Sequence, residues 1–335
     1  MRSARLEMAL DSGAFALPPL GDIVVLSPQA GDDLSALPKA RVVVLTGFKP
    51  DVDHFQAQGY RMEGGQPPAA PPAAPSAAVV CLPRARAEAL ALIAQASALL
   101  PAGAPILVDG QKTDGIDSVL KLARAAGFAL GEVISKAHGK ACVLDAGPQP
   151  TGWAATPRQI EGGFVTLPGV FSADAPDRGS VLLAAALPEK LYGRVADLGA
   201  GWGYLARAIL TRADVKSLDL VEADRAALDC AAANVTDPRA RFHWADATRF
   251  KPAQPWDAVV MNPPFHISRA ADPELGAAFL RAAHRGLLPG GTLWLVANRH
   301  LPYDRILTPL FRTVEEIGGD AVFRLFRAAH PIRAR

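Results

Sequence analysis

Residues 194–210, with the sequence RVADLGAGWGYLARAIL, constrain the fold of this 335-residue chain more than any other stretch. The segment opens on an apolar, β-leaning run, passes through Gly199, Gly201 and Gly203, and continues as an alanine-rich run with no helix breaker. This order predicts a strand, a glycine turn and a helix. Because Gly199 and Gly201 have no Cβ, a ligand could lie directly on the main chain at the helix N-terminus. The turn alone fits a dinucleotide site, an S-adenosylmethionine (AdoMet) site or simply a tight strand-to-helix connection.

Two strand-like runs downstream each end in an acidic residue. Residues 217–222 end at Glu222, a little over twenty residues after Gly199. A carboxylate at that place can accept hydrogen bonds from both hydroxyls of a ribose. Residues 241–246 end at Asp246, which is placed to accept a hydrogen bond from an adenine amino group. The two acids predict an adenosine-like ligand without fixing its chemistry, since NAD enzymes and AdoMet enzymes share the first of them.

A fourth strand, residues 256–261, runs directly into Asn262-Pro263-Pro264-Phe265. The prolines hold a rigid extended turn and lack N–H groups, so the carbonyl of Pro263 is free to face a substrate. With the side-chain oxygen of Asn262, this carbonyl can accept both hydrogens of an exocyclic amine. The amine lone pair is then directed at a methyl donor, while Phe265 stacks on the base. Positioning and stabilisation of developing positive charge should carry the catalysis, because such an amine needs no prior deprotonation.

These motifs together resemble the class I AdoMet-dependent methyltransferases of the NPPF/Y group, which methylate nitrogens conjugated to a planar system. The resemblance implies that AdoMet is the cofactor and that it is bound by Asp197, Gly199, Gly201, Gly203, Glu222, Asp246 and Asn262. It implies a catalytic set formed by Asn262, Pro263 and Phe265.

The first half of the chain repeats the element order of the second half but lacks its motifs. Residues 22–28 include a strand, yet the loop at 27–31 contains a proline and one glycine and should not cradle a cofactor. Residues 77–84 match the pattern of residues 257–264, but Leu82-Pro83-Arg84 cannot offer the oxygen of an asparagine.

We therefore predict an α/β chain of two tandem Rossmann-like class I methyltransferase domains. Each domain has a mostly parallel seven-stranded sheet that ends in an antiparallel hairpin, and the N-terminal copy is degenerate. Residues 1–150 form the degenerate domain, for RNA recognition or structural support, and residues 151–335 form the catalytic domain.

Two copies of the fold, with NPPF only in the second, resemble the RsmC/RlmG family of ribosomal RNA guanine-N2 methyltransferases. The likeness covers most of the chain and includes residues 110–116 and 166–180, although the family segment at 110–116 is usually richer in Lys and Arg. In that family the bridge between the domains closes over the AdoMet site. The resemblance implies that Phe171 covers the ligand and that Asp177 or Ser180 bonds it; a plain inter-domain linker is the alternative.

The resemblance implies methyl transfer from AdoMet to the exocyclic N2 amine of a guanine in ribosomal RNA, foremost 16S rRNA of the small subunit. The motif Asn262-Pro263-Pro264-Phe265 would equally serve another planar amine, namely that of a 23S rRNA guanine, adenine N6 or a protein glutamine. A non-catalytic RNA-binding assembly factor is a third hypothesis, against which the intact cofactor motifs argue.

Composition bounds the remaining possibilities. Half of the residues are apolar, yet no apolar run approaches the ~18 residues of a membrane span. The net charge of +2 is too small to indicate nucleic-acid binding by itself. Cys81, Cys142 and Cys230 are dispersed, which predicts neither a disulfide framework nor a metal site. The opening lacks the apolar stretch of a secretion signal, so we expect a cytoplasmic protein. The resemblance implies ribosomal RNA or the small ribosomal subunit as the partner, and we expect a monomer.

Overall fold

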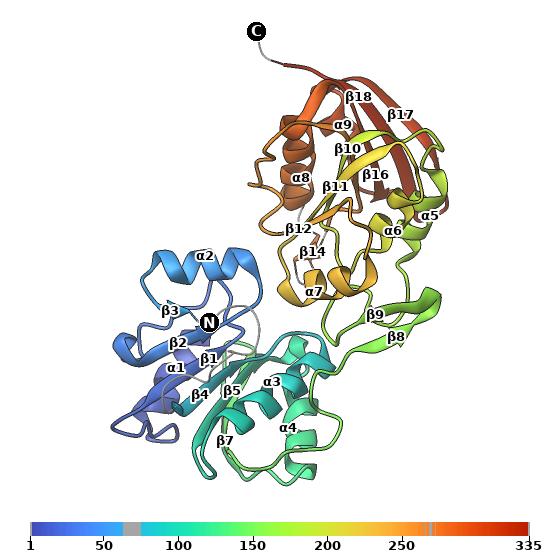
Figure 1. Ribbon diagram of the computed structural model, residues 1–335. Helices are drawn as coiled ribbons and strands as arrows, with labels where there is room; N and C mark the ends of the chain where they lie inside the picture. The colour runs from blue at the N-terminus through green and yellow to red at the C-terminus, as the bar shows by residue number, and fades with distance from the viewer. Residues whose placement is uncertain (1, 63–74, 265, 268–269, 272, 334–335) are drawn as a thin grey trace. The chain divides into compact units, whose positions relative to one another are not determined.

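The computed structural model in Figure 1 describes residues 2–62, 75–264, 266–267, 270–271 and 273–333. The chain divides into two compact units. The first contains residues 1–157 and 167–169, and the second contains residues 158–166 and 170–335. Each unit has its own sheet, with helices on both faces (Figure 1).

The described residues of the first unit form a seven-stranded sheet in the order β3-β2-β1-β4-β5-β7-β6. Neighbouring strands are parallel as far as β5, and β7 is antiparallel to both of its neighbours. The strands are β1 (Asp22–Leu26), β2 (Val42–Leu45), β3 (Arg61–Met62), β4 (Pro75–Cys81), β5 (Pro105–Gln111), β6 (Leu130–Lys136) and β7 (Gly139–Asp145). The α-helices are α1 (Arg2–Asp11), α2 (Lys49–Ala57), α3 (Arg86–Leu99) and α4 (Ile116–Ala125).

The second unit repeats this sheet over its described residues, in the order β12-β11-β10-β13-β16-β18-β17. Its strands are β10 (Gly193–Leu198), β11 (Val215–Glu222), β12 (Ala240–Trp244), β13 (Trp256–Met261), β16 (Leu287–Asn298), β17 (Phe311–Gly319) and β18 (Phe323–Pro331). Its α-helices are α5 (Arg178–Ala186), α6 (Tyr204–Leu210), α7 (Arg225–Asn234), α8 (Pro273–Gly286) and α9 (Tyr303–Leu307). Two small hairpins pair β8 (Arg158–Ile160) with β9 (Phe164–Thr166) and β14 (His266–Ile267) with β15 (Ala270–Ala271).

The identical strand order of the two sheets confirms the predicted tandem α/β architecture. In both sheets the last two strands form the antiparallel hairpin that the sequence predicts. The assignment of residues 1–150 to a degenerate domain and of residues 151–335 to a catalytic domain remains a prediction. The hairpin β8–β9 belongs to the second unit, while Leu167–Gly169 packs with the first.

The central strands are mostly apolar because helices cover both faces of each sheet. In the first unit, residues of α3 and α4 pack on one face and those of α1 on the other. In the second, α5, α6 and α7 share one core, while α8 and α9 share the other. This sandwiching holds the carboxyl ends of the parallel strands in register at one edge of each sheet, where the predicted motifs lie.

The sequence predicts a helix over residues 273–288, but α8 ends at Gly286 and β16 begins at the next residue. The segment 66–75 is rich in proline and alanine, which predicts a polyproline-like or disordered surface loop; residues 66–74 of it lie outside the described residues. Among the helices of the described ranges, none has the length and apolar character needed to cross a membrane.

Candidate active site

The glycine turn between β10 and α6 has the backbone that its sequence predicts. Gly199, Gly201 and Gly203 have φ angles of 74°, 54° and 90°, a left-handed region that side chains with a Cβ rarely adopt. A Cβ on Gly201 would meet nothing within 4 Å, whereas one on Gly203 would lie 2.9 Å from Cγ2 of Val235. Gly201 therefore keeps the turn open to a ligand, while Gly203 lets α6 pack closely on the residues around the end of α7.

A pocket opens at this turn. It brings the glycine turn together with the start of α5 and with Asn262. Its lining residues are Phe171, Ser172, Asp177, Ser180, Gly199, Ala200, Gly201, Trp202, Tyr204, Leu205 and Asn262. Three predicted site residues, Gly199, Gly201 and Asn262, thus meet in one pocket. Four others, Asp197, Gly203, Glu222 and Asp246, do not line it.

Asp197 is a fully buried acid near the carboxyl end of β10. Neither of its carboxylate oxygens has a hydrogen-bond partner among the described residues. Burial, reinforced by the nearby Glu222, raises the pKa of Asp197 to about 8, and the backbone amide of Ala206 only partly offsets the rise. A buried carboxyl group of this kind favours a cationic or hydrogen-bond-donating ligand close by.

Glu222 ends β11 and is tied to the glycine turn. Its Oε2 accepts a hydrogen bond from the Gly201 amide at 2.7 Å, and Oε1 accepts one from the Asp224 amide at 2.8 Å. Burial raises its pKa to about 7 despite these bonds. The residue therefore fixes the turn and keeps an acid beside it.

Asp246 follows β12 and organises the turn after it. Its Oδ1 accepts hydrogen bonds from the amide of Thr248 at 2.8 Å and from the hydroxyl of Thr248 at 2.6 Å. Its Oδ2 lies 3.7 Å from Nε of Arg249. One oxygen is thus committed to local structure, which leaves Oδ2 as the atom that could meet a ligand.

Asn262 follows β13 and is half-buried. Its Nδ2 donates to Oδ2 of Asp177 and to Oγ of Ser180, each at 2.8 Å. The sequence placed Asp177 and Ser180 near a ligand but did not connect them with Asn262. Of the residues that follow, Pro263 is buried and Pro264 is exposed, while Phe265 lies outside the described residues.

The Phe171 turn forms one wall of the pocket. The Phe171 carbonyl accepts a hydrogen bond from Nε1 of Trp202 at 2.8 Å, and Ser172 has a φ of 51°. The hydroxyl of Thr166 donates to the Ala173 carbonyl at 2.8 Å. These bonds hold a strained backbone, and they leave the Phe171 side chain 59% exposed at the pocket.

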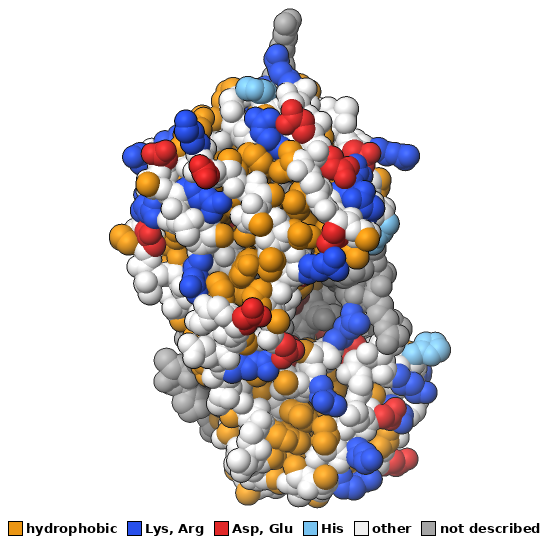
Figure 2. All heavy atoms as spheres, turned by 90° about the vertical axis from the view of Figure 1, so that its right-hand side faces the viewer, with side chains coloured by type: hydrophobic (Ala, Val, Ile, Leu, Met, Phe, Trp, Pro, Cys, Tyr) orange, Lys and Arg blue, Asp and Glu red, His pale blue; other side chains and the backbone are white. Residues whose placement is uncertain are grey.

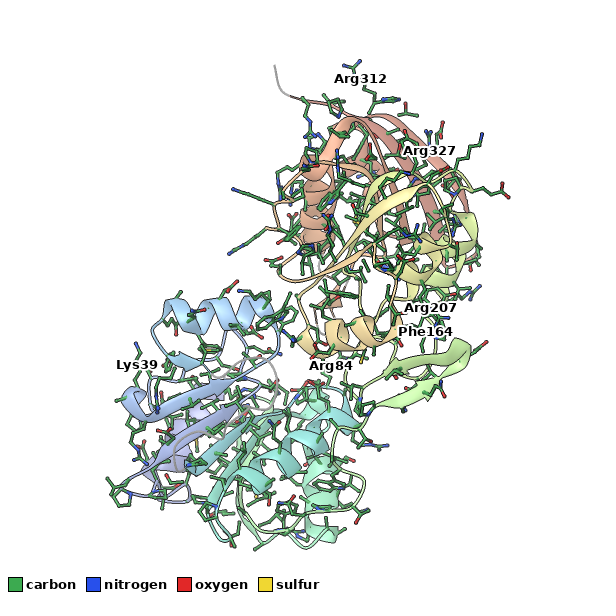
Figure 3. The ribbon with its side chains drawn as sticks, viewed as in Figure 1. Lys39, Arg84, Phe164, Arg207, Arg312 and Arg327 are labelled. Atoms are coloured by element: carbon green, nitrogen blue, oxygen red, sulfur yellow. The ribbon has the colours of Figure 1, made fainter. Side chains whose placement is uncertain are left out.

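Aromatic residues connect the β8–β9 hairpin to the glycine turn. Phe164 packs against Trp202 and Tyr204 at ring-centroid distances of 4.9 and 5.5 Å. The guanidinium of Arg207 lies 4.1 Å from the Phe164 ring centroid (Figure 3). The side chain of Asn234 bonds both the amide and the carbonyl of Val165. The sequence analysis missed this support. The signal available for it was the aromatic pair Trp202 and Tyr204 at the glycine turn.

Charges on the second unit are mixed. Lys and Arg side chains alternate with Asp and Glu on the upper part of the face in Figure 2. Arg324 pairs with Glu316 and Arg327 with Glu315 across the β17–β18 hairpin. These two arginines are three residues apart on one strand, so they point to opposite sides of it and do not form a basic stripe.

Comparison with known proteins adds independent findings. The family described as Methyltransferase small domain matches residues 161–327. The ribosomal RNA small subunit methyltransferase C of Cronobacter sakazakii is 32% identical over 269 residues, which cover 73% of this chain and 73% of that protein. The protein of the same name from Psychromonas ingrahamii is 31% identical over 248 residues and covers 71% of both chains.

A solved structure matches nearly the whole chain. It is described as the T. thermophilus 16S rRNA N2 G1207 methyltransferase (RsmC) in complex with AdoMet and guanosine. The similarity has a TM-score of 0.79 at 25% identity, and it covers 98% of this chain and 91% of that one. The predicted resemblance and the predicted class of enzyme are confirmed: the chain belongs to the ribosomal RNA small subunit methyltransferase C family.

Proposed function

We propose that this chain transfers the methyl group of AdoMet to the exocyclic N2 amine of a guanine in 16S ribosomal RNA. The observation that carries the proposal is the amide of Asn262, which lines the pocket with the glycine turn and whose nitrogen is hydrogen-bonded to Asp177 and Ser180. The names of the matching relatives supply the substrate class, and the bound AdoMet and guanosine of the T. thermophilus enzyme supply the cofactor and the base.

The residues of the pocket fit AdoMet. This cofactor carries a sulfonium and an ammonium group, and the turn is flanked by the acids Asp197 and Glu222, whose pKa values are raised by burial. Gly201 leaves room for the ligand. When bound, AdoMet supplies an electrophilic methyl group. In this assignment Glu222 accepts hydrogen bonds from the ribose, and Asp246 accepts one from the adenine amine through Oδ2.

The chain's own residues orient the substrate amine. Guanine N2 carries two hydrogens, for which Oδ1 of Asn262 and the carbonyl of Pro263 are the two acceptors. Phe265 is assigned to stack on the base. Holding the amine in this way directs its lone pair along one line and stabilises the positive charge that develops on nitrogen.

The target guanine has to leave its helical stack, because a paired base cannot reach the end of β13. It therefore lies in a loop or is flipped out on binding. We assign the first unit to RNA recognition or structural support, and we expect a monomeric protein that works in the cytoplasm on the small subunit or its RNA.

The direct test is methyl transfer from labelled AdoMet to small subunits, free 16S rRNA and 23S rRNA taken from cells that lack this protein, followed by nucleoside analysis. N2-methylguanosine in 16S rRNA is the expected product. Label in 23S rRNA, in adenine N6 or in a protein glutamine would instead favour one of the alternative amines. AdoMet binding with no acceptor at all would contradict an enzymatic role on these substrates.

The role of Asn262 is tested in the same assay. Asn262→Ala removes the proposed amine acceptor, whose hydrogen bonds among the described residues go to Asp177 and Ser180 and not to the glycine turn, so we expect nearly all turnover to be lost while AdoMet affinity is kept. Affinity is measured by calorimetry. Turnover equal to that of the wild type would show that another group accepts the amine.

A further inference from the structure

The amide group of Asn262 is held in one orientation by two acceptors. A primary amide nitrogen has two hydrogens, and here one is donated to Oδ2 of Asp177 and the other to Oγ of Ser180, both at 2.8 Å. Rotating the amide by 180° would place Oδ1 against the carboxylate of Asp177. That arrangement puts two acceptor oxygens in contact, so the observed orientation is strongly preferred.

Both acceptors are themselves fixed at the start of α5. Asp177 caps this helix, since its Oδ2 also accepts the amide hydrogen of Ser180 at 2.9 Å. The Ser180 side chain is buried. Gly179, between them, allows α5 to approach the sheet closely: a Cβ there would lie 3.1 Å from the Phe323 ring and 3.3 Å from Cγ2 of Val296. The helix start is thereby pressed against the sheet beside Asn262.

The orientation matters because the two ends of an amide have opposite hydrogen-bonding character. An amine on a planar ring presents N–H donors, which need the oxygen of Asn262. A flipped amide would present its own N–H groups instead, and donor would face donor. Among the described residues, none donates a hydrogen bond to Oδ1 of Asn262, the atom that the proposed function assigns as acceptor for the substrate amine.

We propose that Asp177 and Ser180 are positioning residues that lock the Asn262 amide with Oδ1 toward the target amine. This inference rests on the proposed role of Asn262 as the amine acceptor. It differs from the role that family resemblance implies for the same residues, which is direct contact with AdoMet. The two roles make different demands: a lock acts on turnover, whereas a cofactor contact acts on AdoMet affinity.

Ser180→Ala is the sharpest variant, because it removes one acceptor of Nδ2 but keeps the backbone amide that Asp177 caps. We expect kcat on the RNA substrate to fall by about tenfold. The Kd for AdoMet should stay within twofold of the wild-type value. The thermal midpoint should stay within about 2 °C of that of the wild type. Ser217→Ala is the matched control, since Ser217 is also buried in the second unit but does not line the pocket. Its kcat should match that of the wild type.

Asp177 provides a second, independent comparison. Asp177→Asn keeps an oxygen that can both cap α5 and accept from Nδ2, whereas Asp177→Ala removes both bonds. We expect Asp177→Asn to retain clearly more of the wild-type kcat than Asp177→Ala does, with AdoMet affinity similar in the two variants.

Two results would overturn the positioning role. One is an unchanged kcat in Ser180→Ala. The other is weakened AdoMet binding in that variant with kcat restored at saturating AdoMet, which would make Ser180 a cofactor contact. Failure of the proposed function is separately visible, because it would leave the wild type itself without N2-methylguanosine product.

Discussion

At the scale of single residues, the acids Asp197 and Glu222 couple cofactor binding to pH. With a pKa of about 8, Asp197 is largely protonated at pH 7, and with a pKa of about 7, Glu222 is about half protonated there. A cation nearby favours the charged form and lowers both pKa values, so AdoMet binding should release protons. We expect AdoMet to bind more tightly at pH 8.5 than at pH 6. Calorimetry at pH 7, in buffers with different ionisation enthalpies, should show net proton release.

Asp197→Asn provides the control for this coupling. Raising the pH strengthens AdoMet binding through Asp197, but it weakens the stability of the free protein through the same residue. A folded-state pKa raised from 3.8 means that the acid favours the folded state least at high pH, and that its unfavourable effect grows as pH rises from about 4 to 8. The variant should therefore lose less of its thermal midpoint than the wild type between pH 5 and pH 9, while binding AdoMet poorly. Proton release by the variant equal to that of the wild type would show that Asp197 does not titrate on binding.

At the scale of elements, the packing of α6 depends on Gly203. Gly203→Ala would place a Cβ 2.9 Å from Cγ2 of Val235 at a φ of 90°, so we expect a loss of about 2–3 kcal/mol in the free energy of unfolding. Thermal denaturation of the whole chain measures the effect. Gly290→Ala is the matched control: Gly290 has no left-handed φ and nothing within 4 Å of its Cβ. A Gly203→Ala midpoint as high as that of Gly290→Ala would refute the close packing.

The elements that sequence could predict are those whose pattern is local. Apolar strands and the glycine turn carry their own signals, and Asn262 lies where strand β13 ends, as predicted. The partners of Asn262 were not predictable in this way, because Asp177 is 85 residues away and meets it only once α5 lies on the sheet. The β8–β9 hairpin was missed for a similar reason, since its strands are three residues long and depend on Trp202 and Asn234 for support.

At the scale of the whole molecule, strand register identifies which residues of the two sheets correspond. Asp197 pairs with Val260, two residues before Asn262. Asp197 lies on the face of its sheet that α5 covers, since its neighbours Ala196 and Leu198 pack with α8 and α9 on the other face. In the first sheet the equivalent face is covered by α1, and on it Val25 pairs with Val79, two residues before Cys81. A buried valine therefore stands in place of the orphaned acid and a buried cysteine in place of the amine acceptor. The duplicated fold retained its cores while its first copy lost the groups that meet a cofactor and a substrate.

At the carboxyl ends of the strands of the first sheet, buried arginine side chains occupy the space. Their positive charge disfavours a cationic cofactor there. Arg5, which is fully buried, donates from Nε and Nη2 to the carboxylate of Asp109, both at 2.7 Å, and from Nη1 to the Lys136 carbonyl at 2.9 Å. Arg2 donates to the Asp109 carbonyl at 3.2 Å. Asp109 is thus already neutralised, and opening this network to admit a ligand would leave a buried charge unpaired.

We therefore expect one AdoMet per chain. Titration calorimetry on the full chain should give a stoichiometry of one, and Asp197→Asn should weaken that single binding event without exposing a second. The matched variant is Val25→Asp, which restores an acid to the equivalent face of the first sheet but not the glycine turn that Ser27-Pro28 replaces; it should bind no additional AdoMet. Two equivalents of AdoMet bound by the wild type would mean that the first unit also binds the cofactor despite its buried arginines. The assignment of cofactor binding to the second unit alone would then be wrong.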